Sequence, residues 1–136
     1  MMQQPTASNE NTSRNCILIV EDDPDIGQLL VLALASQTPY RPVLASNEQE
    51  ALHTVEAVTP ALVLLDYQLP GTTGVKVYDH LRAKNELRAL PAIVLSASLP
   101  RQELQERHLV GIAKPFDLDD LLETIDQVLT SSSASA

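Results

Sequence analysis

Short apolar runs recur along the chain and alternate with segments whose apolar residues have helical spacing. Each run holds four to six residues and is rich in Val, Ile, Leu and Ala. That length and composition are typical of strands buried on both faces of a parallel sheet. We predict strands at 16–20, 42–45, 61–66, 92–97 and 111–114.

The segments between these runs predict helices. The clearest is the last, in which apolar residues from Leu118 to Leu129 repeat at helical spacing. The segment 100–109 has little apolar face, so only a short helix is predicted there. The last helix follows Asp117, and other helices also follow residues that suit a helix start or a tight turn. These other predicted starts are Asp23 with Pro24, Ser46 or Asn47, and Gly74.

Strict alternation of strands and helices predicts an α/β fold. The expected architecture is a flavodoxin-like (βα)5 three-layer sandwich with a parallel sheet in the order 2-1-3-4-5. In such a sheet, ligands bind at the carboxyl ends of the strands, where strands 1 and 3 lie side by side. The domain is predicted over 15–130, and the polar tails 1–14 and 131–136 are predicted to be disordered.

Composition limits the partners and the cellular location expected for this domain. The 136-residue chain carries a net charge of −9, which disfavours direct contact with nucleic acid. No apolar run reaches the roughly 18–20 residues that span a bilayer, so no membrane insertion is expected. The start of the chain lacks the features of a secretory signal, and a cytoplasmic location is predicted. The single cysteine, Cys16, is expected to be a buried apolar residue.

Polar residues end the strands that should meet at one edge of the sheet. Glu21 and Asp22 follow the first strand, Asp66 ends the third, and Ser96 and Lys114 close the fourth and fifth. Clustered carboxylates must bind protons or a cation, and oxygen ligands suit Mg²⁺. With a hydroxyl and an ammonium group, they have the composition of a phosphoryl-transfer site.

Structural roles explain some of these residues as well. Asp23 and Asp25 fit a helix cap and a first-turn acid, whereas capping accounts less well for Glu21 and Asp22. Asp66, Ser96 or Lys114 taken singly would not indicate a function. The prediction therefore depends on the whole set.

Four motifs in this order resemble the receiver domain of two-component response regulators, in particular single-domain, chemotaxis-regulator-like members. The resemblance covers about residues 15–130. Its motifs are LIVEDD (18–23), LLDYQLPGTTG (64–74), VLSAS (94–98) and KPF (114–116).

The resemblance implies a role for each site residue. Asp66 would be the phosphoacceptor, and Lys114 and Ser96 would bind the phosphoryl group. Glu21, Asp22, Asp66 and the backbone carbonyl of Gln68 would hold Mg²⁺ or Mn²⁺. The bond between Lys114 and Pro115 is a cis peptide in the family.

Two departures from the family pattern concern the outer surface. Relatives often carry Tyr or Phe three residues before the lysine, where this chain has Gly111. The segment between Ser96 and Lys114 is also shorter than in many relatives. We therefore expect phosphorylation to be relayed by rearrangement of the fourth helix or through another face.

The predicted function is that of a stand-alone response regulator or phosphorelay receiver without turnover of an external substrate. A histidine kinase or histidine phosphotransfer protein would phosphorylate Asp66, and the phosphorylated form would contact an unidentified protein target. One alternative is an adaptor that binds partners constitutively. Others are a phosphatase with an Asp nucleophile, disfavoured by the lack of an Asp-x-Asp motif, and a flavodoxin-like cofactor binder, disfavoured by the lack of a phosphate loop.

Overall fold

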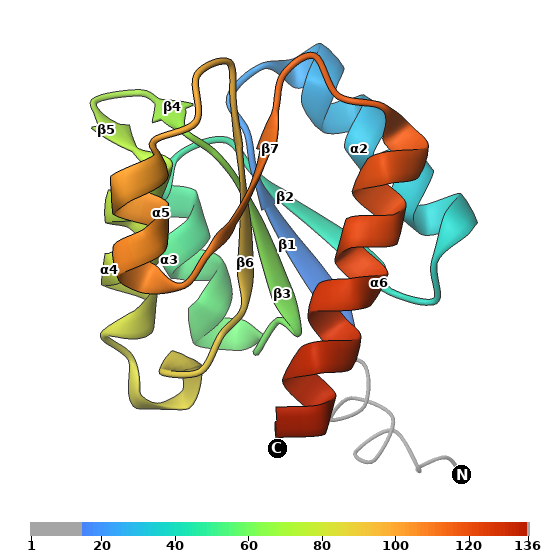
Figure 1. Ribbon diagram of the computed structural model, residues 1–136. Helices are drawn as coiled ribbons and strands as arrows, with labels where there is room; N and C mark the ends of the chain where they lie inside the picture. Colours follow the sequence, from blue (N-terminus) through green and yellow to red (C-terminus); the bar gives the residue numbers. More distant parts are fainter. Residues whose placement is uncertain (1–14, 136) are drawn as a thin grey trace, which may run out of the picture.

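The computed structural model describes the chain from Asn15 to Ser135, with side chains described as far as residue 131. Residues 1–14, predicted as a disordered tail, and residue 136 lie outside this range. Within it, five strands form one parallel sheet in the order β2-β1-β3-β6-β7, which confirms the predicted order (Figure 1). The strands are β1 (Cys16–Val20), β2 (Arg41–Ala45), β3 (Leu62–Asp66), β6 (Ala92–Ser96) and β7 (Val110–Ala113).

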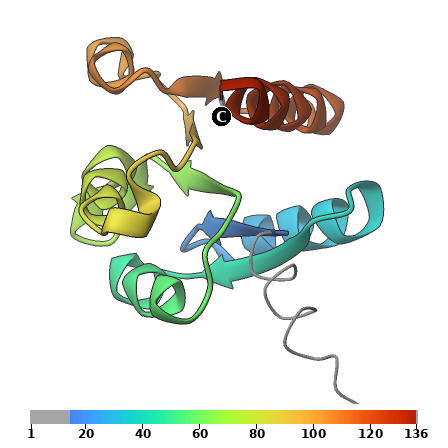
Figure 2. The ribbon, with the colours of Figure 1, turned by 90° about the horizontal axis from the view of Figure 1, so that it is seen from below.

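Helices cover both faces of the sheet, as predicted for a three-layer sandwich. The end-on view in Figure 2 shows one group of helices on one face of the sheet and a second group on the other. The first group is α2 (Pro24–Gln37) and α6 (Leu118–Ser135). The second group is α3 (Glu48–Ala57), α4 (Gly74–Arg82) and α5 (Arg101–Arg107).

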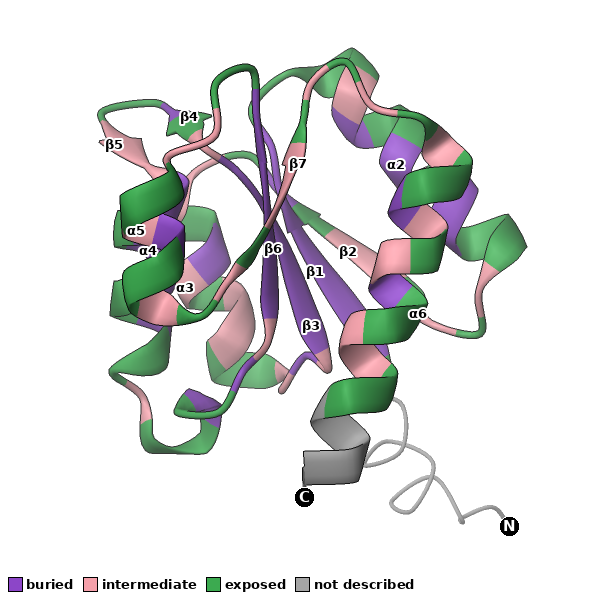
Figure 3. Ribbon diagram, viewed as in Figure 1, coloured by how far each residue is buried: buried purple, intermediate pink, exposed green. Residues whose placement is uncertain are grey.

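The three central strands form the core. All residues of β1, β3 and β6 are buried, whereas both edge strands are partly exposed (Figure 3). Alternate residues of the central strands point to opposite faces, and each face packs against its own helix layer. This burial on both faces explains why the sequences of the central strands are almost uninterrupted apolar runs. Cys16, the first residue of β1, is fully buried, as predicted.

Side-chain caps fix where helices begin. The Asp23 carboxylate accepts from the backbone N–H of Asp25 at 2.9 Å, so Asp23 caps α2 as predicted. Of the two candidates for α3, Asn47 is the cap, since its side chain accepts from the Glu50 N–H at 2.8 Å. The structure places Thr73 as the cap of α4, and Gly74 is the first helical residue.

Three features differ from the predicted elements. Two-residue strands β4 (Gln68–Leu69) and β5 (Thr72–Thr73) pair into a small antiparallel hairpin. A 3-10 helix, η1 (Asn85–Leu87), precedes β6. The tail predicted for 131–136 is wrong over most of its length, because α6 continues to Ser135. No Gly or Pro interrupts that segment, so nothing in it forces the helix to end near residue 130.

No helix within the described part of the chain is both long and apolar enough to cross a membrane.

Candidate functional site

Three carboxylates converge at the carboxyl edge of the sheet. Glu21 and Asp22 directly follow β1, and Asp66 is the last residue of the adjacent strand β3. One carboxylate oxygen from each residue lies within 4.8 Å of the other two. Together these residues line a hollow of about 620 Å³, so the sheet order brings together acids that are 45 residues apart in the sequence.

Glu21 is in an unfavourable environment for a charge. Its side chain is buried, with 3% of the residue exposed. Oε2 accepts from the Asp23 N–H at 3.1 Å, but Oε1 has no hydrogen-bond partner among the described residues. Burial raises the pKa of Glu21, and the nearby Asp66 and Asp22 charges add to this effect. The Asp23 hydrogen bond and the Lys114 charge lower it, but they do not cancel the rise.

Lys114 provides the positive charge of the site. Its Nζ donates to Asp66 Oδ1 at 2.6 Å and lies 4.0 Å from Glu21 Oε1. The Lys114 backbone N–H donates to the Ser96 carbonyl at 2.8 Å, which fixes this residue just after β7. The Lys114–Pro115 peptide bond is cis, as the resemblance implied.

Ser96 and Asp66 face a second hollow, of about 390 Å³, which Lys114 also lines. The Ser96 hydroxyl is nearly buried, with 5% of the residue exposed. Its Oγ donates to the Ser98 carbonyl at 2.7 Å and accepts from the Ser98 N–H at 3.2 Å. The hydroxyl therefore lies in the predicted place, where its single hydrogen is used by the loop after β6.

Gln68 lies in β4, two residues beyond Asp66, and lines both hollows. Its side chain is exposed, so its backbone is the part that the hairpin holds close to the acidic cluster. The structure thus brings all the sequence-predicted site residues to one edge of the sheet.

The oxygen donors at this edge fit a hard divalent cation such as Mg²⁺. A buried carboxylate oxygen without a partner is costly, and coordination of a cation would satisfy it. Glu21 Oε1 is such an atom, and it lies in the cluster formed with Asp22 and Asp66.

Tyr67 is a residue of this site that the sequence analysis did not single out. It directly follows Asp66, lines both hollows, and its hydroxyl donates to Glu103 Oε1 on α5 at 2.7 Å. Its position next to Asp66 was a visible clue, but a partner 36 residues away could not be inferred from local pattern.

Gly111 shows how this chain fills the place of the usual aromatic residue. A Cβ atom at Gly111 would lie 2.6 Å from Leu104 Cδ1 and 2.9 Å from Leu99 Cδ2. Two leucine side chains therefore occupy the space beside the backbone of β7, and α5 packs directly over this glycine.

Comparisons with known proteins agree with this architecture. The family model "Response regulator receiver domain" matches residues 17–126. The chain is 34% identical over 116 residues to Protein Rrf1 of Nitratidesulfovibrio vulgaris. The aligned region covers 85% of this chain and 83% of Rrf1. It is 30% identical over 124 residues to the phosphate regulon regulator PhoB of Escherichia coli, covering 88% of this chain and 54% of PhoB. The chain thus spans about half the length of PhoB and of several other curated relatives.

Solved structures give the same result. The response regulator TrrA of Thermotoga maritima superimposes with a TM-score of 0.73 at 29% identity, covering 84% of this chain and 98% of TrrA. A receiver domain protein of Methanospirillum hungatei gives a TM-score of 0.80 at 23% identity, covering 90% of this chain and 99% of that protein, and supports the fold alone. The chain belongs to the family of response regulator receiver domains.

Proposed function

We propose that Asp66 accepts a phosphoryl group from a histidine kinase or histidine phosphotransfer protein in a Mg²⁺-dependent reaction. The observation that carries this proposal is the pairing of the nearly buried Asp66 carboxylate with Lys114 Nζ at 2.6 Å, beside the two other carboxylates of the cluster. Receiver domains as a family act in two-component signalling, and the site geometry supports the same chemistry here.

In the proposed transfer, an Asp66 carboxylate oxygen forms a bond to phosphorus. The P–N bond to the donor histidine breaks, and the imidazole keeps the electron pair. Lys114 stabilises the negative charge on the transferred group as a point charge and holds Asp66 in place before the reaction. Catalysis of this kind is mostly positioning and electrostatic stabilisation.

Ser96 is proposed to hydrogen-bond a phosphoryl oxygen. A hydroxyl has one hydrogen, and that of Ser96 points to the Ser98 carbonyl. Donation to the phosphoryl group therefore requires this bond to break, which frees the loop that leads into α5.

Glu21, Asp22, Asp66 and the Gln68 carbonyl are the proposed ligands of Mg²⁺. When bound, the cation supplies positive charge that neutralises the phosphoryl oxygens. The acidic cluster matches the Mg²⁺ site of receiver domains, and TrrA of Thermotoga maritima was solved in complex with Mg²⁺ and beryllium fluoride.

We propose that the domain signals through protein–protein contacts that depend on phosphorylation of Asp66. PhoB and BaeR are named as transcriptional regulators, but this chain spans about half of each, so their output is not carried over. Action as a stand-alone protein and a cytoplasmic location stay predictions from the sequence.

Phosphate-affinity electrophoresis after treatment with acetyl phosphate and Mg²⁺ tests the proposal. The wild-type chain should give a retarded band, and Asp66→Asn should give none. Asp126→Asn, a matched change on the exposed face of α6, should behave like the wild type. Chelation of Mg²⁺ should abolish the retarded band. A band of equal intensity in Asp66→Asn would refute Asp66 as the acceptor, and no band in the wild type would favour an adaptor that binds constitutively.

A further inference from the structure

The helix α5 depends on contacts with other elements to stay in place. It has seven residues, and its cap position, Pro100, makes no side-chain hydrogen bond. Helices this short are marginal on their own, because the cost of nucleation is spread over few hydrogen bonds. The position of α5 is therefore set by what it packs against.

Packing fixes one side of α5 through a small apolar cluster. Leu104 is buried with Val75 and Val94, and the partly buried Tyr67 and Leu99 pack against this group. The buried residues of this cluster are distinct from those of the two main cores, and the partly buried Leu109 packs against both this cluster and the core on the same face. A small cluster of this kind can rearrange without disrupting the rest of the fold.

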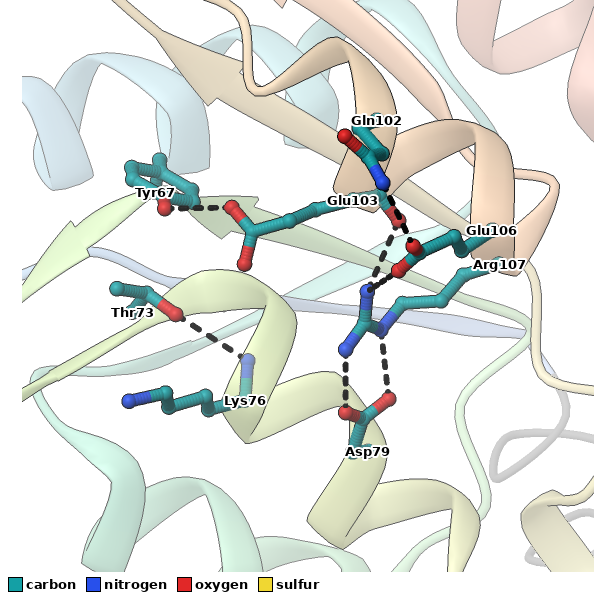
Figure 4. A network of polar contacts seen from close by, with 8 residues as sticks. All are labelled: Tyr67, Thr73, Lys76, Asp79, Gln102, Glu103, Glu106 and Arg107. Atoms are coloured by element: carbon teal, nitrogen blue, oxygen red, sulfur yellow. Dashed lines mark hydrogen bonds and ion pairs between the residues drawn. The ribbon is translucent and has the colours of Figure 1, made fainter.

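Two polar contacts attach α5 to other elements within the described residues. The Tyr67 hydroxyl donates to Glu103 Oε1 at 2.7 Å, and the Arg107 guanidinium donates twice to the Asp79 carboxylate of α4, both at 2.8 Å (Figure 4). Arg107 also donates to the backbone carbonyl of Glu103 at 2.9 Å. The contact with Tyr67 and the contact with Asp79 are thus joined at one turn of the helix.

Tyr67 is held firmly at its backbone and reaches α5 only with its side chain. Its N–H donates to the Leu95 carbonyl at 2.8 Å, and its carbonyl accepts from the Gly74 N–H at 2.7 Å. These bonds tie Tyr67 to the ends of β6 and α4. A displacement of the end of β3, where Asp66 lies, would act directly on Tyr67, since the two residues share a peptide bond.

We propose that Tyr67 couples the chemical state of Asp66 to the position of α5 through its hydrogen bond with Glu103. This inference rests on the proposed function of Asp66. The route differs from one through an aromatic residue at position 111, where this chain has glycine and where the ends of the Leu104 and Leu99 side chains occupy the adjoining space.

The coupling has a direct physical cause. A phosphoryl group adds a charge of about −1.5 to −2 near neutral pH, directly before Tyr67 in the chain. The new oxygens attract Lys114 and the Ser96 hydroxyl, and the accommodating shift at the end of β3 moves the phenol relative to Glu103. Because α5 is held by few contacts, the change of one of them displaces the helix.

Amide NMR shifts of residues 101–107 measure the coupling, with beryllium fluoride and Mg²⁺ as the phosphoryl mimic. In the wild-type domain these amides should shift on addition of the mimic. In Tyr67→Phe, which keeps the ring in the apolar cluster but removes the hydroxyl, the shifts should fall by at least half. Tyr40→Phe is the matched control, since Tyr40 packs on the opposite face of the sheet, and it should keep the full response.

A second pair of variants tests the bond from the side of α5. Glu103→Ala removes the acceptor and should reduce the response as Tyr67→Phe does. Glu106→Ala removes an exposed acid from the same helix and should leave the response intact. These surface changes are not expected to prevent folding, so the result stays informative if Tyr67→Phe is unstable.

The outcomes separate the coupling from the proposed function. Full α5 shifts in both Tyr67→Phe and Glu103→Ala would overturn the coupling, as would a wild-type domain that is phosphorylated by acetyl phosphate without any shift in 101–107. A wild-type domain that gives no retarded band in electrophoresis would overturn the proposed function itself, and the coupling with it.

Discussion

At the scale of single residues, Gly74 marks a close approach of two backbone segments beside the site. A Cβ atom there would lie 2.5 Å from the Asp66 carbonyl oxygen and 3.2 Å from the Asp66 carbonyl carbon. Both are backbone atoms, so no side-chain rotation can relieve the contact. The Gly74 N–H also donates to the Tyr67 carbonyl at 2.7 Å, which holds the segment in this place.

Gly74→Ala should therefore destabilise the domain by about 1–3 kcal/mol, as overpacking of a well-packed site does. Gly27→Ala is the matched control, because its Cβ would meet only the flexible end of the Leu44 side chain, at 3.0 Å. Helix propensity favours alanine at this position by roughly 0.5–1 kcal/mol, which offsets the contact. Urea unfolding measures both changes. Equal midpoints for Gly74→Ala and the wild type would contradict the tight approach.

Residue identity predicted some local details of the structure and not others. Asp23 as a cap could be read from its place before Pro24, because the requirement is local. The choice between Ser46 and Asn47 could not be made, since both side chains can cap and the backbone decides. The bond between Tyr67 and Glu103 was also beyond prediction, because it depends on how α5 packs.

At the scale of elements, one ion pair joins α4 and α5, beside the apolar cluster to which Val75 of α4 and Leu104 of α5 belong. Arg107 donates two hydrogen bonds to Asp79, and these bonds lower the pKa of the Asp79 carboxyl, outweighing its partial burial. A carboxyl group whose pKa is lowered in the folded state stabilises that state above its unfolded pKa. This contribution is lost as the pH falls through the lowered pKa.

Asp79→Asn should accordingly lower the free energy of unfolding at neutral pH, by at most about 1 kcal/mol because the Asp79 side chain is 45% exposed. The difference from the wild type should shrink as the pH falls below the ordinary Asp pKa of about 3.9. Denaturant unfolding at several pH values measures this, with Asp126→Asn as the control. A deficit that stays constant down to the lowest pH at which the domain is folded would contradict the ion-pair explanation.

Element order was the most predictable part of the fold. The apolar runs predicted β1, β3 and β6 because these strands are buried on both faces, and their polar residues Asp66 and Ser96 lie at the strand ends. The β4–β5 hairpin was missed because two-residue strands have no periodicity to detect. The end of α6 was missed because serine and alanine neither favour a stop nor require a tail.

At the scale of the whole molecule, repulsion within the acidic cluster works against folding, and the proposed cation would relieve it. The chain already carries a net charge of −9, and Glu21 adds a buried carboxylate oxygen without a hydrogen-bond partner among the described residues. A ligand that binds only the folded state stabilises it according to its concentration relative to Kd. Stability and Mg²⁺ binding should therefore be linked through Glu21.

Glu21→Gln should have opposite effects in the two conditions. In chelator it should be more stable than the wild type, by about 1 kcal/mol or more, because a buried charge is removed. Mg²⁺ at about 100 times Kd should stabilise the wild type by about 2.7 kcal/mol, and most of this gain should be lost in Glu21→Gln.

Thermal unfolding with and without Mg²⁺ measures both effects of Glu21→Gln. Glu123→Gln, an exposed change on α6, is the control and should respond to Mg²⁺ as the wild type does. Equal Mg²⁺ stabilisation of Glu21→Gln and the wild type would argue against Glu21 as a ligand.

The strand order also divides the site into two parts that differ in local stability. Glu21 and Asp66 are attached to β1 and β3, each paired on both sides, whereas Lys114 follows the edge strand β7. Edge elements open to solvent at a lower free energy than the centre of a sheet. Local opening of β7 would therefore withdraw the ammonium group while the carboxylates stay together. The domain would then expose a cluster of uncompensated negative charge before any global unfolding, and a divalent cation bound to these carboxylates would compensate for the lost positive charge.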